Sequence, residues 1–369
     1  MRAINKYFLL FLFLFCAAGT AVAKADQDAP ARRALFISVI QDPQVLSTEE
    51  EINKLVAFSK KADIKILFVQ IYRANQAWFP SKVADASPYE KYRKSLGQDP
   101  LALLIKNAHA ENIEVHAWLN LLSLSVNKDA PLLKKYGHSI LTQNVLRKKT
   151  LEDYKIDNQY FLEPGDPRVR EDLVKIVKEI LGTYKELDGI QFDYIRYPDV
   201  KPQYGYTEMN MERFKKATGI GKVDEKDLRW KDWKRDQVTE LLKLLVKTSR
   251  SVRPGIQVSS TGCMPYSRAY HEAFQDWSSW LDSGLIEFVT MMNYSDDPVE
   301  FAQLNKTMQS KVKDFKKVKV AVGAYKFLNS PENFAEELSS CEALGSTCAI
   351  FHYGSLLENP RLSDVLTAF

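Results

Sequence analysis

The feature that most constrains the fold is a regular alternation of short apolar runs with helical patterns along most of the 369 residues. The runs are near-continuous stretches of β-branched, aliphatic and aromatic residues, as in strands that are buried on both faces. Eight is the number of parallel strands that closes an α/β barrel. The runs lie at 35–40, 66–72, 115–119, 189–194, 256–260, 288–292, 318–322 and 348–352.

Helical patterns fill the intervals between these runs. In the first of them, Ser47 or Thr48 caps a segment that places Ile52, Leu55 and Val56 on one face. Strands that alternate with helices predict a parallel sheet with helical crossovers. An open doubly wound sheet is the alternative, but no Gly-x-Gly-x-x-Gly follows the first run. The patterns lie at 48–61, 101–111, 169–187, 233–251, 273–282, 298–315 and 331–344.

We therefore expect one α/β domain over 24–369, a (β/α)8 TIM barrel with long loops after strands 3 and 4. Those loops cover 122–167 and 198–230. Loops of this length in a compact domain are usually functional, and both follow strand carboxyl ends, which form the catalytic face of such barrels. The strands are expected to end near Ile40, Tyr72, Leu119, Tyr194, Ser260, Met292, Ala324 and Phe351.

Residues 1–23 have the pattern of a secretory signal peptide. Positive charges precede an apolar run at 7–15, and 21–23 form a small-x-small cleavage site. The run is short for a membrane span. A lipoprotein signal at Cys16 is the alternative, yet Phe15 stands where such a signal needs a small residue. We expect a cleaved leader and a secreted or periplasmic protein, with no stable membrane insertion after cleavage.

Charge and composition argue against several other classes. The net charge is +4, and without Arg2 and Lys6 it is +2, from 49 Lys and Arg residues against 47 Asp and Glu. That balance gives no reason to expect a nucleic acid or an anionic membrane surface as partner. The five histidines are scattered, so we expect no metal site, and nothing in the sequence indicates a cofactor.

Three cysteines follow the leader, at positions 263, 341 and 348. An odd count in an exported chain leaves at least one thiol unpaired. Cys341 and Cys348 are close enough to close a short loop, which makes them candidates for a disulfide that the expected compartment permits. The alternative is that all three are small buried residues.

Polar and aromatic side chains follow the predicted strands and should converge on one mouth of the barrel. An aromatic-rich mouth suits sugar rings, whose C–H faces pack on aromatic side chains while their hydroxyls form hydrogen bonds. Each aromatic residue could instead belong to the wall. The residues concerned are Gln41, Asp42, Gln70, Tyr72, Arg73, Trp118, Asn120, Asp193, Arg196, Ser260, Asn293, Tyr294, Tyr325, His352 and Tyr353.

Asp193 stands apart because it interrupts an otherwise apolar strand at 189–195. An unpaired carboxylate at such a place is costly, so we expect Arg196 or Arg73 to pair with it. A structural salt bridge is the alternative to a catalytic role.

Two motifs, LEPGDPRVR at 162–170 and DGIQFDYIRYP at 188–198, resemble glycosyl-hydrolase-like family ten, a group of bacterial exported barrels. Shorter segments at 116–120, 233–236, 275–280 and 292–294 resemble it in the same order, and the similarity extends over about 35–359. The resemblance implies a (β/α)8 barrel and glycoside hydrolysis. Characterised relatives act on peptidoglycan strands stripped of peptide or on amino-sugar polymers.

The chain departs from the commonest family pattern at the fourth strand. Many members carry Asp-Asp-Tyr there, whereas Phe192 precedes a single Asp193 here. Hydrolysis usually needs two carboxyl groups, so the second one is open. In chitinase-like barrels the strand ends on an acid glutamate, but Ile195 occupies that position, so that proton donor is missing. Candidates for the second acid are Glu163 and Asp296, ranked ahead of Asp297 and Asp42.

We interpret the chain as an exported glycoside hydrolase for an N-acetylhexosamine or hexosamine polymer such as peptidoglycan strands. The alternative is a glycan-binding barrel that has lost hydrolysis, and a second acid across the mouth discriminates between them. We expect a polysaccharide partner and a monomer. The catalytic candidates are Asp193, Glu163 and Asp296, and the sugar-binding candidates are Arg73, Trp118, Asn120, Arg196, Asn293, Tyr294 and Tyr325.

Overall fold

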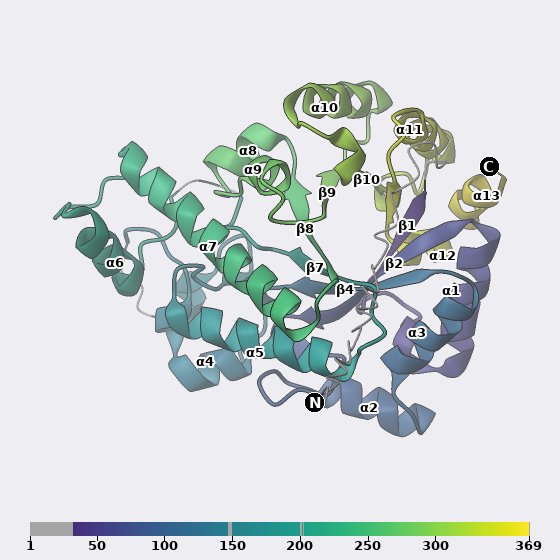
Figure 1. Cartoon of the computed structure of the whole chain (residues 1–369), viewed down its shortest axis with the longest axis horizontal. Coiled ribbons are helices and arrows are strands. Elements are labelled where there is room, and N and C mark those ends of the chain that lie inside the picture. Colours follow the sequence, from purple (N-terminus) through teal and green to yellow (C-terminus); the bar gives the residue numbers. More distant parts are fainter. Residues whose placement is uncertain (1–31, 147–149, 200, 202, 369) are drawn as a thin grey trace, which may run out of the picture. The chain divides into compact units, whose positions relative to one another are not determined.

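The computed structural model describes residues 32–368 except 147–149, 200 and 202; the expected leader and Cys16 lie outside the described residues. Eight parallel strands in the described part of the chain close into a barrel with helices around it (Figure 1), which confirms the predicted (β/α)8 fold. The barrel strands are β1 (Arg33–Ile37), β2 (Ile64–Arg73), β4 (Glu114–Asn120), β7 (Gly189–Asp193), β8 (Gln257–Cys263), β9 (Phe288–Asn293), β10 (Val318–Gly323) and β11 (Cys348–Phe351).

Closure depends on β1, which pairs in parallel with β2 on one side and with β11 on the other. This strand ends at Ile37 and not at the predicted Ile40, because the residues that follow Ile37 form hydrogen bonds with the Gln70 side chain instead of with a neighbouring strand. Gln70 Oε1 accepts hydrogen bonds from Ser38 Oγ at 3.1 Å and from the Val39 amide at 3.2 Å. Strand β8 runs three residues past the predicted Ser260, since its pairing with β9 continues to Cys263 opposite Met292.

Helices occupy every interval in which the sequence predicts one, but of the pattern at 273–282 only α9 (Trp277–Asp282) forms, and another short helix, α8 (Tyr266–His271), precedes it. Asp-Pro pairs begin three of the helices: Asp99, Asp166 and Asp297 cap a backbone amide while proline takes the first helical position. The larger helices are α1 (Glu49–Lys61), α2 (Ser87–Leu96), α3 (Pro100–Ala110), α5 (Pro167–Thr183), α7 (Leu228–Val252), α10 (Pro298–Lys311) and α11 (Pro331–Ala343).

The two long connections carry structure of their own, which the sequence analysis did not anticipate. A two-stranded sheet in the first of them pairs β5 (Ser123–Ser125) with β6 (Tyr160–Phe161). The second carries a helix, and another two helices follow the last barrel strand. The remaining elements are α4 (Pro131–Tyr136), α6 (Glu208–Thr218), α8 (Tyr266–His271), α9 (Trp277–Asp282), α12 (Tyr353–Glu358), α13 (Pro360–Ala368) and the short β3 (Gln76–Ala77), antiparallel to β2.

Side chains fill the barrel interior. The Phe36 ring lies 4.8 Å from Phe68 and 5.1 Å from Trp118, between ring centroids. Gly189 begins the fourth barrel strand because His116 occupies the adjacent space: a Cβ atom on that glycine would lie 2.1 Å from the imidazole Nδ1. The interior is therefore a packed core that supports the mouth from below.

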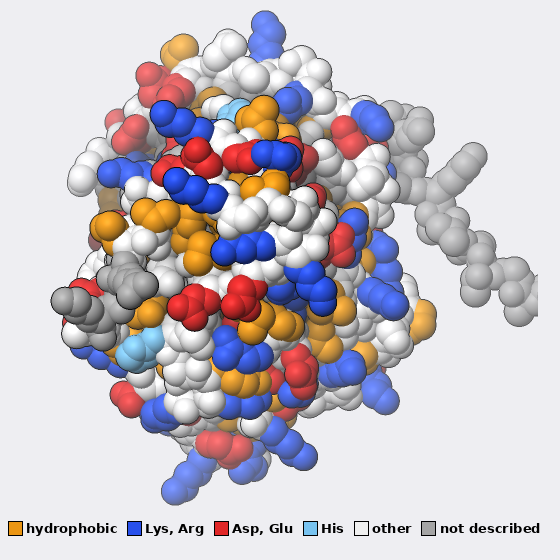
Figure 2. Space-filling model, turned by 90° about the vertical axis from the view of Figure 1, so that its left-hand side faces the viewer, with side chains coloured by type: hydrophobic (Ala, Val, Ile, Leu, Met, Phe, Trp, Pro, Cys, Tyr) orange, Lys and Arg blue, Asp and Glu red, His pale blue; other side chains and the backbone are white. Residues whose placement is uncertain are grey.

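Two properties bear on possible partners: the charge of the face drawn in Figure 2 and the absence of a membrane-spanning helix among the described residues. On the face drawn in Figure 2, acidic and basic side chains are interspersed, in line with the small net charge. None of the helices in the described ranges is both long and apolar enough to cross a membrane.

The expected pair of cysteines, Cys341 at the end of α11 and Cys348 at the start of β11, forms a disulfide, and Cys263 is a buried free thiol. The bond closes a short loop, with the two cysteines seven positions apart. Such a cross-link restricts the unfolded chain.

Replacing Cys341 and Cys348 together by alanine should lower the free energy of unfolding by about 2–3 kcal/mol, because the unfolded chain regains the entropy of the open loop. Urea denaturation measures the change. Thiol counting on the denatured wild-type protein should find two additional thiols after reduction. An unchanged count on reduction would contradict the disulfide.

Glu337 on α11 is a buried acid whose two carboxylate oxygens have no hydrogen-bond partner among the described residues. Burial first, and then the negative charges of Asp296 and Asp297, raise its pKa to about 8. The unfolded chain ionises at the ordinary value near 4.5. Folding is therefore favoured by this group below the ordinary pKa, and that contribution is lost as the pH rises through about 8.

Glu337→Gln should accordingly raise the free energy of unfolding at pH 9 relative to wild type, while the difference shrinks toward pH 5. The neighbouring exposed Glu336, replaced by glutamine, is the matched control and should show no such pH dependence. Urea titrations at several pH values measure both variants. Parallel wild-type and Glu337→Gln profiles would show that Glu337 is not held protonated.

Candidate functional site

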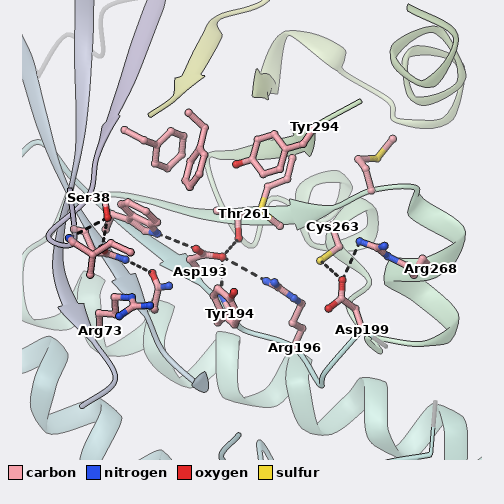
Figure 3. A pocket seen from close by; sticks show the side chains of 18 residues that line it. Ser38, Arg73, Asp193, Tyr194, Arg196, Asp199, Thr261, Cys263, Arg268 and Tyr294 are labelled. Carbon is pink, nitrogen blue, oxygen red and sulfur yellow. Dashed lines mark hydrogen bonds and ion pairs between the residues drawn. The ribbon is translucent and has the colours of Figure 1, made fainter. Parts of the chain in front are cut away.

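A pocket of about 350 Å³ lies at the carboxyl ends of the barrel strands (Figure 3). The mouth thus forms where the strand pattern predicted it. Six of the ten catalytic and sugar-binding candidates line this pocket, together with Gln70, which was also expected at the mouth: Arg73, Trp118, Asn120, Asp193, Arg196 and Tyr294.

Asp193 ends β7 at the base of the pocket, and the residue as a whole is only 4% exposed. One oxygen, Oδ2, accepts a hydrogen bond from the Trp118 indole at 3.0 Å. The other, Oδ1, accepts from Thr261 Oγ1 at 2.6 Å and the Tyr194 amide at 2.7 Å. Arg196 Nη1 lies 3.4 Å from Oδ1. Donors on both oxygens compensate the buried charge and fix its orientation.

A backbone turn after β7 brings Arg196 back onto the carboxylate. Tyr194 has a φ of 52°, which is unusual for a residue with a bulky side chain and marks a sharp change of chain direction. The guanidinium carbon of Arg196 then lies 4.2 Å from the centre of the Tyr194 ring. Of the two expected partners of Asp193, Arg196 forms the ion pair and Arg73 lines the pocket wall.

Polar side chains on the opposite wall form a short chain of hydrogen bonds. Gln70 Nε2 donates to Asn120 Oδ1 at 3.0 Å, and Ser38 Oγ donates to Gln70 Oε1 at 3.1 Å. All three residues line the pocket. The chain orients the Asn120 amide and gives the pocket fixed polar groups that could contact hydroxyl or amide groups of a ligand.

Aromatic rings form the upper wall. The Tyr294 and Phe351 ring centroids are 5.2 Å apart, and Trp118 and Phe351 are 5.9 Å apart. Burial first, and then the charge of Asp193, raise the pKa of Tyr294 well above its usual value, so its hydroxyl is neutral. Tyr325 does not line the pocket; its ring packs edge-on against Tyr294 at 5.8 Å, so it supports this wall from outside.

Asn293 was expected in the mouth, and that expectation is wrong. Its side chain is fully buried and donates to the Phe301 carbonyl at 3.0 Å and to Asn305 Oδ1 at 2.9 Å, both on α10. Side chains alternate along a strand, and Met292 and Tyr294 line the pocket. Asn293 therefore points outward to the helices.

The second acids that we nominated do not line the pocket. Glu163 is fully buried behind it, and its Oε1 accepts a hydrogen bond of 2.5 Å from the Tyr197 hydroxyl. Burial raises the pKa of this carboxyl group. The motif around Glu163 therefore serves the packing of the two long connections, because Tyr197 follows β7 while Glu163 follows β6.

The other nominated acids lie at the surface. Asp296 is exposed, with Lys326 Nζ 3.7 Å from its carboxylate. Asp297 caps α10 through the Val299 amide at 2.8 Å. Asp42 is exposed and does not line the pocket. Loop residues can turn away from a strand end, so proximity in sequence was a weak guide for these three.

Asp199 is the acid that the sequence analysis missed. It lines the pocket together with Asp193, and in the close-up Arg196 lies between the two carboxylates (Figure 3). Arg268 Nη2 lies 3.0 Å from Asp199 Oδ2. The nearby Cys263 thiol is neutral, because burial raises its pKa to about 12. The only sequence signal for Asp199 was its place directly after the fourth-strand motif.

The chain has Phe192 where many family members have a second aspartate, but this difference does not cost the pocket a carboxylate. Gln191 and Asp193 point inward, the former donating to Thr290 Oγ1 at 2.7 Å, whereas Phe192 packs in the layer between strands and helices. A second acid at position 192 would face that outer layer. Among the described residues no group of three or more His, Cys, Asp or Glu side chains is placed to hold a metal ion.

Comparison with known proteins agrees with this geometry. The family model for Glycosyl hydrolase-like 10 matches residues 33–337. Glycosyl hydrolase DigH of Escherichia coli K12 is 25% identical over 253 residues, which cover 64% of this chain and 55% of the relative. Glycosyl hydrolase YngK of Bacillus subtilis is 25% identical over 301 residues, 74% of this chain and 56% of the relative. The chain thus spans about half the length of these curated relatives.

Solved structures share the fold. The glycoside hydrolase domain of PgaB (BpsB) from Bordetella bronchiseptica superposes with a TM-score of 0.66 at 15% identity, covering 91% of this chain and 98% of that domain. Alpha-L-fucosidase isoenzyme 2 from Paenibacillus thiaminolyticus superposes with a TM-score of 0.58 at 12% identity, covering 92% of this chain and 48% of that one. At these identities the likeness concerns the barrel itself.

Tyr197→Phe should lower the free energy of unfolding by about 1–3 kcal/mol, because it deprives the buried Glu163 carboxyl of its hydroxyl partner. Tyr89→Phe is the matched control: its hydroxyl donates to Asp99 Oδ2 at 3.0 Å, but that oxygen also receives the Tyr184 hydroxyl at 2.9 Å. The free energy of unfolding should therefore fall less in Tyr89→Phe than in Tyr197→Phe. Equal losses in urea denaturation would show that the contact between Glu163 and Tyr197 does not stabilise the fold.

Proposed function

The chain belongs to the glycosyl hydrolase-like 10 family, and we propose that it hydrolyses glycosidic bonds with Asp193 as a catalytic carboxylate. One observation carries this proposal. Asp193 is a buried, oriented carboxylate at the carboxyl end of the fourth barrel strand, at the base of an aromatic-walled pocket. Barrel enzymes place their catalytic groups at this face.

In such a reaction a water molecule adds across the bond between two sugars. Its hydroxyl group joins the anomeric carbon and a proton joins the leaving oxygen, through a transition state with positive charge on the sugar ring. The negative carboxylate of Asp193 is suited to stabilise that positive charge. The donors Trp118, Thr261 and Arg196 hold it in one orientation, so little reorganisation is needed when charge develops.

We assign the second carboxylate to Asp199. It shares the pocket with Asp193, and its side chain is 27% exposed, compared with 6% for Asp193. Its ion pair with Arg268 is partly exposed to solvent and can therefore exchange with a ligand or a water molecule at modest cost. In this assignment Asp193 and Asp199 are the pair of carboxyl groups that hydrolysis usually needs.

The proposed substrate is a polymer of N-acetylhexosamine or hexosamine, such as peptidoglycan strands. The family resemblance supports this class, and so does the pairing of an aromatic wall with the amide groups of Asn120 and Gln70. We propose that the protein acts outside the cytoplasm. The leader pattern supports this location, as does the disulfide between Cys341 and Cys348, since such bonds persist in oxidising compartments.

A glycan-binding barrel without hydrolysis is the second candidate. The observation that favours it is that both carboxylate oxygens of Asp193 already accept hydrogen bonds and that Arg196 forms an ion pair with the carboxylate. A purely structural salt bridge would have the same contacts. Binding of glycans without cleavage would support this alternative.

Asp193→Asn should lower turnover by about 100-fold or more while the barrel stays folded, because the amide keeps the shape and removes the charge. The measurement is the release of fragments from peptide-free peptidoglycan strands and N-acetylglucosamine oligomers, followed by mass spectrometry. Circular dichroism checks the fold. Full activity of the folded variant would exclude a catalytic role, and loss of folding would make Asp193 structural.

Asp188→Asn is the matched control, because Asp188 lies directly before β7, at the end of the strand opposite to Asp193. Its carboxylate accepts a hydrogen bond from the Val115 amide at 2.7 Å and lies 2.9 Å from His109 Nε2. This variant should lose some stability and keep its turnover. A loss of turnover as large as that of Asp193→Asn would mean that strand distortion, and not the missing charge, explains the result.

A further inference from the structure

We propose that a groove beside the pocket binds the continuation of the same glycan chain, so that the protein favours oligomers over disaccharides. This inference rests on the proposed function. The groove lies between α8 and α9 on one side and α10 on the other, helices that are neighbours in Figure 1, and its volume is about 630 Å³.

The groove adjoins the catalytic pocket. Met264 lines both hollows. The segment that follows β8 separates them: Arg268 faces the pocket beside Asp199, whereas Tyr266 and Tyr270 face the groove. In this proposal the glycan chain leaves the pocket past Met264, the lining residue that the two hollows share.

The volumes support an extended ligand. Pockets for drug-sized molecules measure about 300–1,000 Å³, so the catalytic pocket, at about 350 Å³, lies near the lower end. It accommodates only a short part of a polymer. The pocket and the groove together approach the upper end of that range.

The groove walls have the chemistry that sugars require, because aromatic faces alternate with hydroxyl groups. Arg235 stacks on the Tyr270 ring at 4.1 Å from its centre, which fixes the ring from one side. The Tyr266 ring packs edge-on against Trp277 at 5.2 Å, and its hydroxyl donates to Asp276 Oδ1 at 2.5 Å. Rings held in this way bind a sugar face with little loss of side-chain entropy.

Polar groups complete the groove on the α10 side. Thr307 and Lys311 of α10 are exposed and line it, and Ser267 and Ser279 face them from the other wall. Lys311 Nζ lies 4.6 Å from the centre of the Tyr266 ring. Lys311 can donate to the hydroxyl and acetamido oxygens of a neutral N-acetylhexosamine chain. The hydroxyls of Thr307 and Ser279 donate to the Gln303 carbonyl and to Asp276 Oδ2, so they can accept from sugar hydroxyls.

The experiment measures binding apart from cleavage. Asp193→Asn protein is titrated by calorimetry with N-acetylglucosamine oligomers of two and six units. We expect the hexamer to bind about tenfold tighter than the dimer or better, which corresponds to about 1.4 kcal/mol from the groove. Adding Tyr270→Ala should remove most of that gain and leave dimer binding unchanged.

Two further variants keep the test independent of folding. Thr307→Trp fills the groove from an exposed helix position and should also abolish the preference for the hexamer. Tyr136→Ala is the matched control, since this tyrosine is likewise stacked by an arginine, Arg168 at 5.5 Å, but lies on α4 and lines neither hollow. It should leave both affinities unchanged.

The outcomes separate this inference from the proposed function. Equal affinity for dimer and hexamer, no binding of the hexamer, or a hexamer preference that survives both Tyr270→Ala and Thr307→Trp overturns the groove site. A wild-type protein that binds the hexamer through the groove without cleaving it leaves the groove site standing and overturns hydrolysis.

Discussion

The structure depends on the double pairing of β1. This strand of five residues hydrogen-bonds to β2 along one edge and to β11 along the other. The first and the last barrel strand in the sequence are therefore neighbours. Closure leaves no free edge among the eight barrel strands. It also brings all their carboxyl ends to one rim, and for that reason residues as distant as Phe36, Asp193 and Phe351 line one pocket.

Trp118 links the packed interior to the chemistry above it. Its ring belongs to the aromatic cluster inside the barrel, against Phe36 and Phe351, while its indole nitrogen donates to Asp193. The carboxylate is therefore anchored to the aromatic cluster inside the barrel. Thr261 anchors it from the neighbouring strand β8, so two barrel strands besides β7 fix its position.

The loops add the parts of the site that the barrel cannot supply. The turn at Tyr194 folds Arg196 over Asp193, and the chain then continues to Asp199 at the pocket wall. Behind this turn the buried contact of Glu163 with Tyr197 joins the connection after β4 to the one after β7. Glu163, a candidate for the second acid, is thus part of the support on which the pocket rests.

The sequence by itself determined the barrel, made Cys341 and Cys348 candidates for a disulfide and singled out Asp193 at a strand end, because each depends on local pattern or on one strand's hydrophobicity. Trp118, Asn120 and Arg196 followed from their places at strand ends. Only the tertiary structure decided which of two neighbouring residues points into the pocket. A shift of one residue reverses the face of a strand, so Met292 and Tyr294 line the pocket while Asn293 binds α10. Loop acids depend on contacts between distant segments: Glu163 turns inward to Tyr197 and Asp199 toward Arg268, and no local sequence pattern encodes those partners.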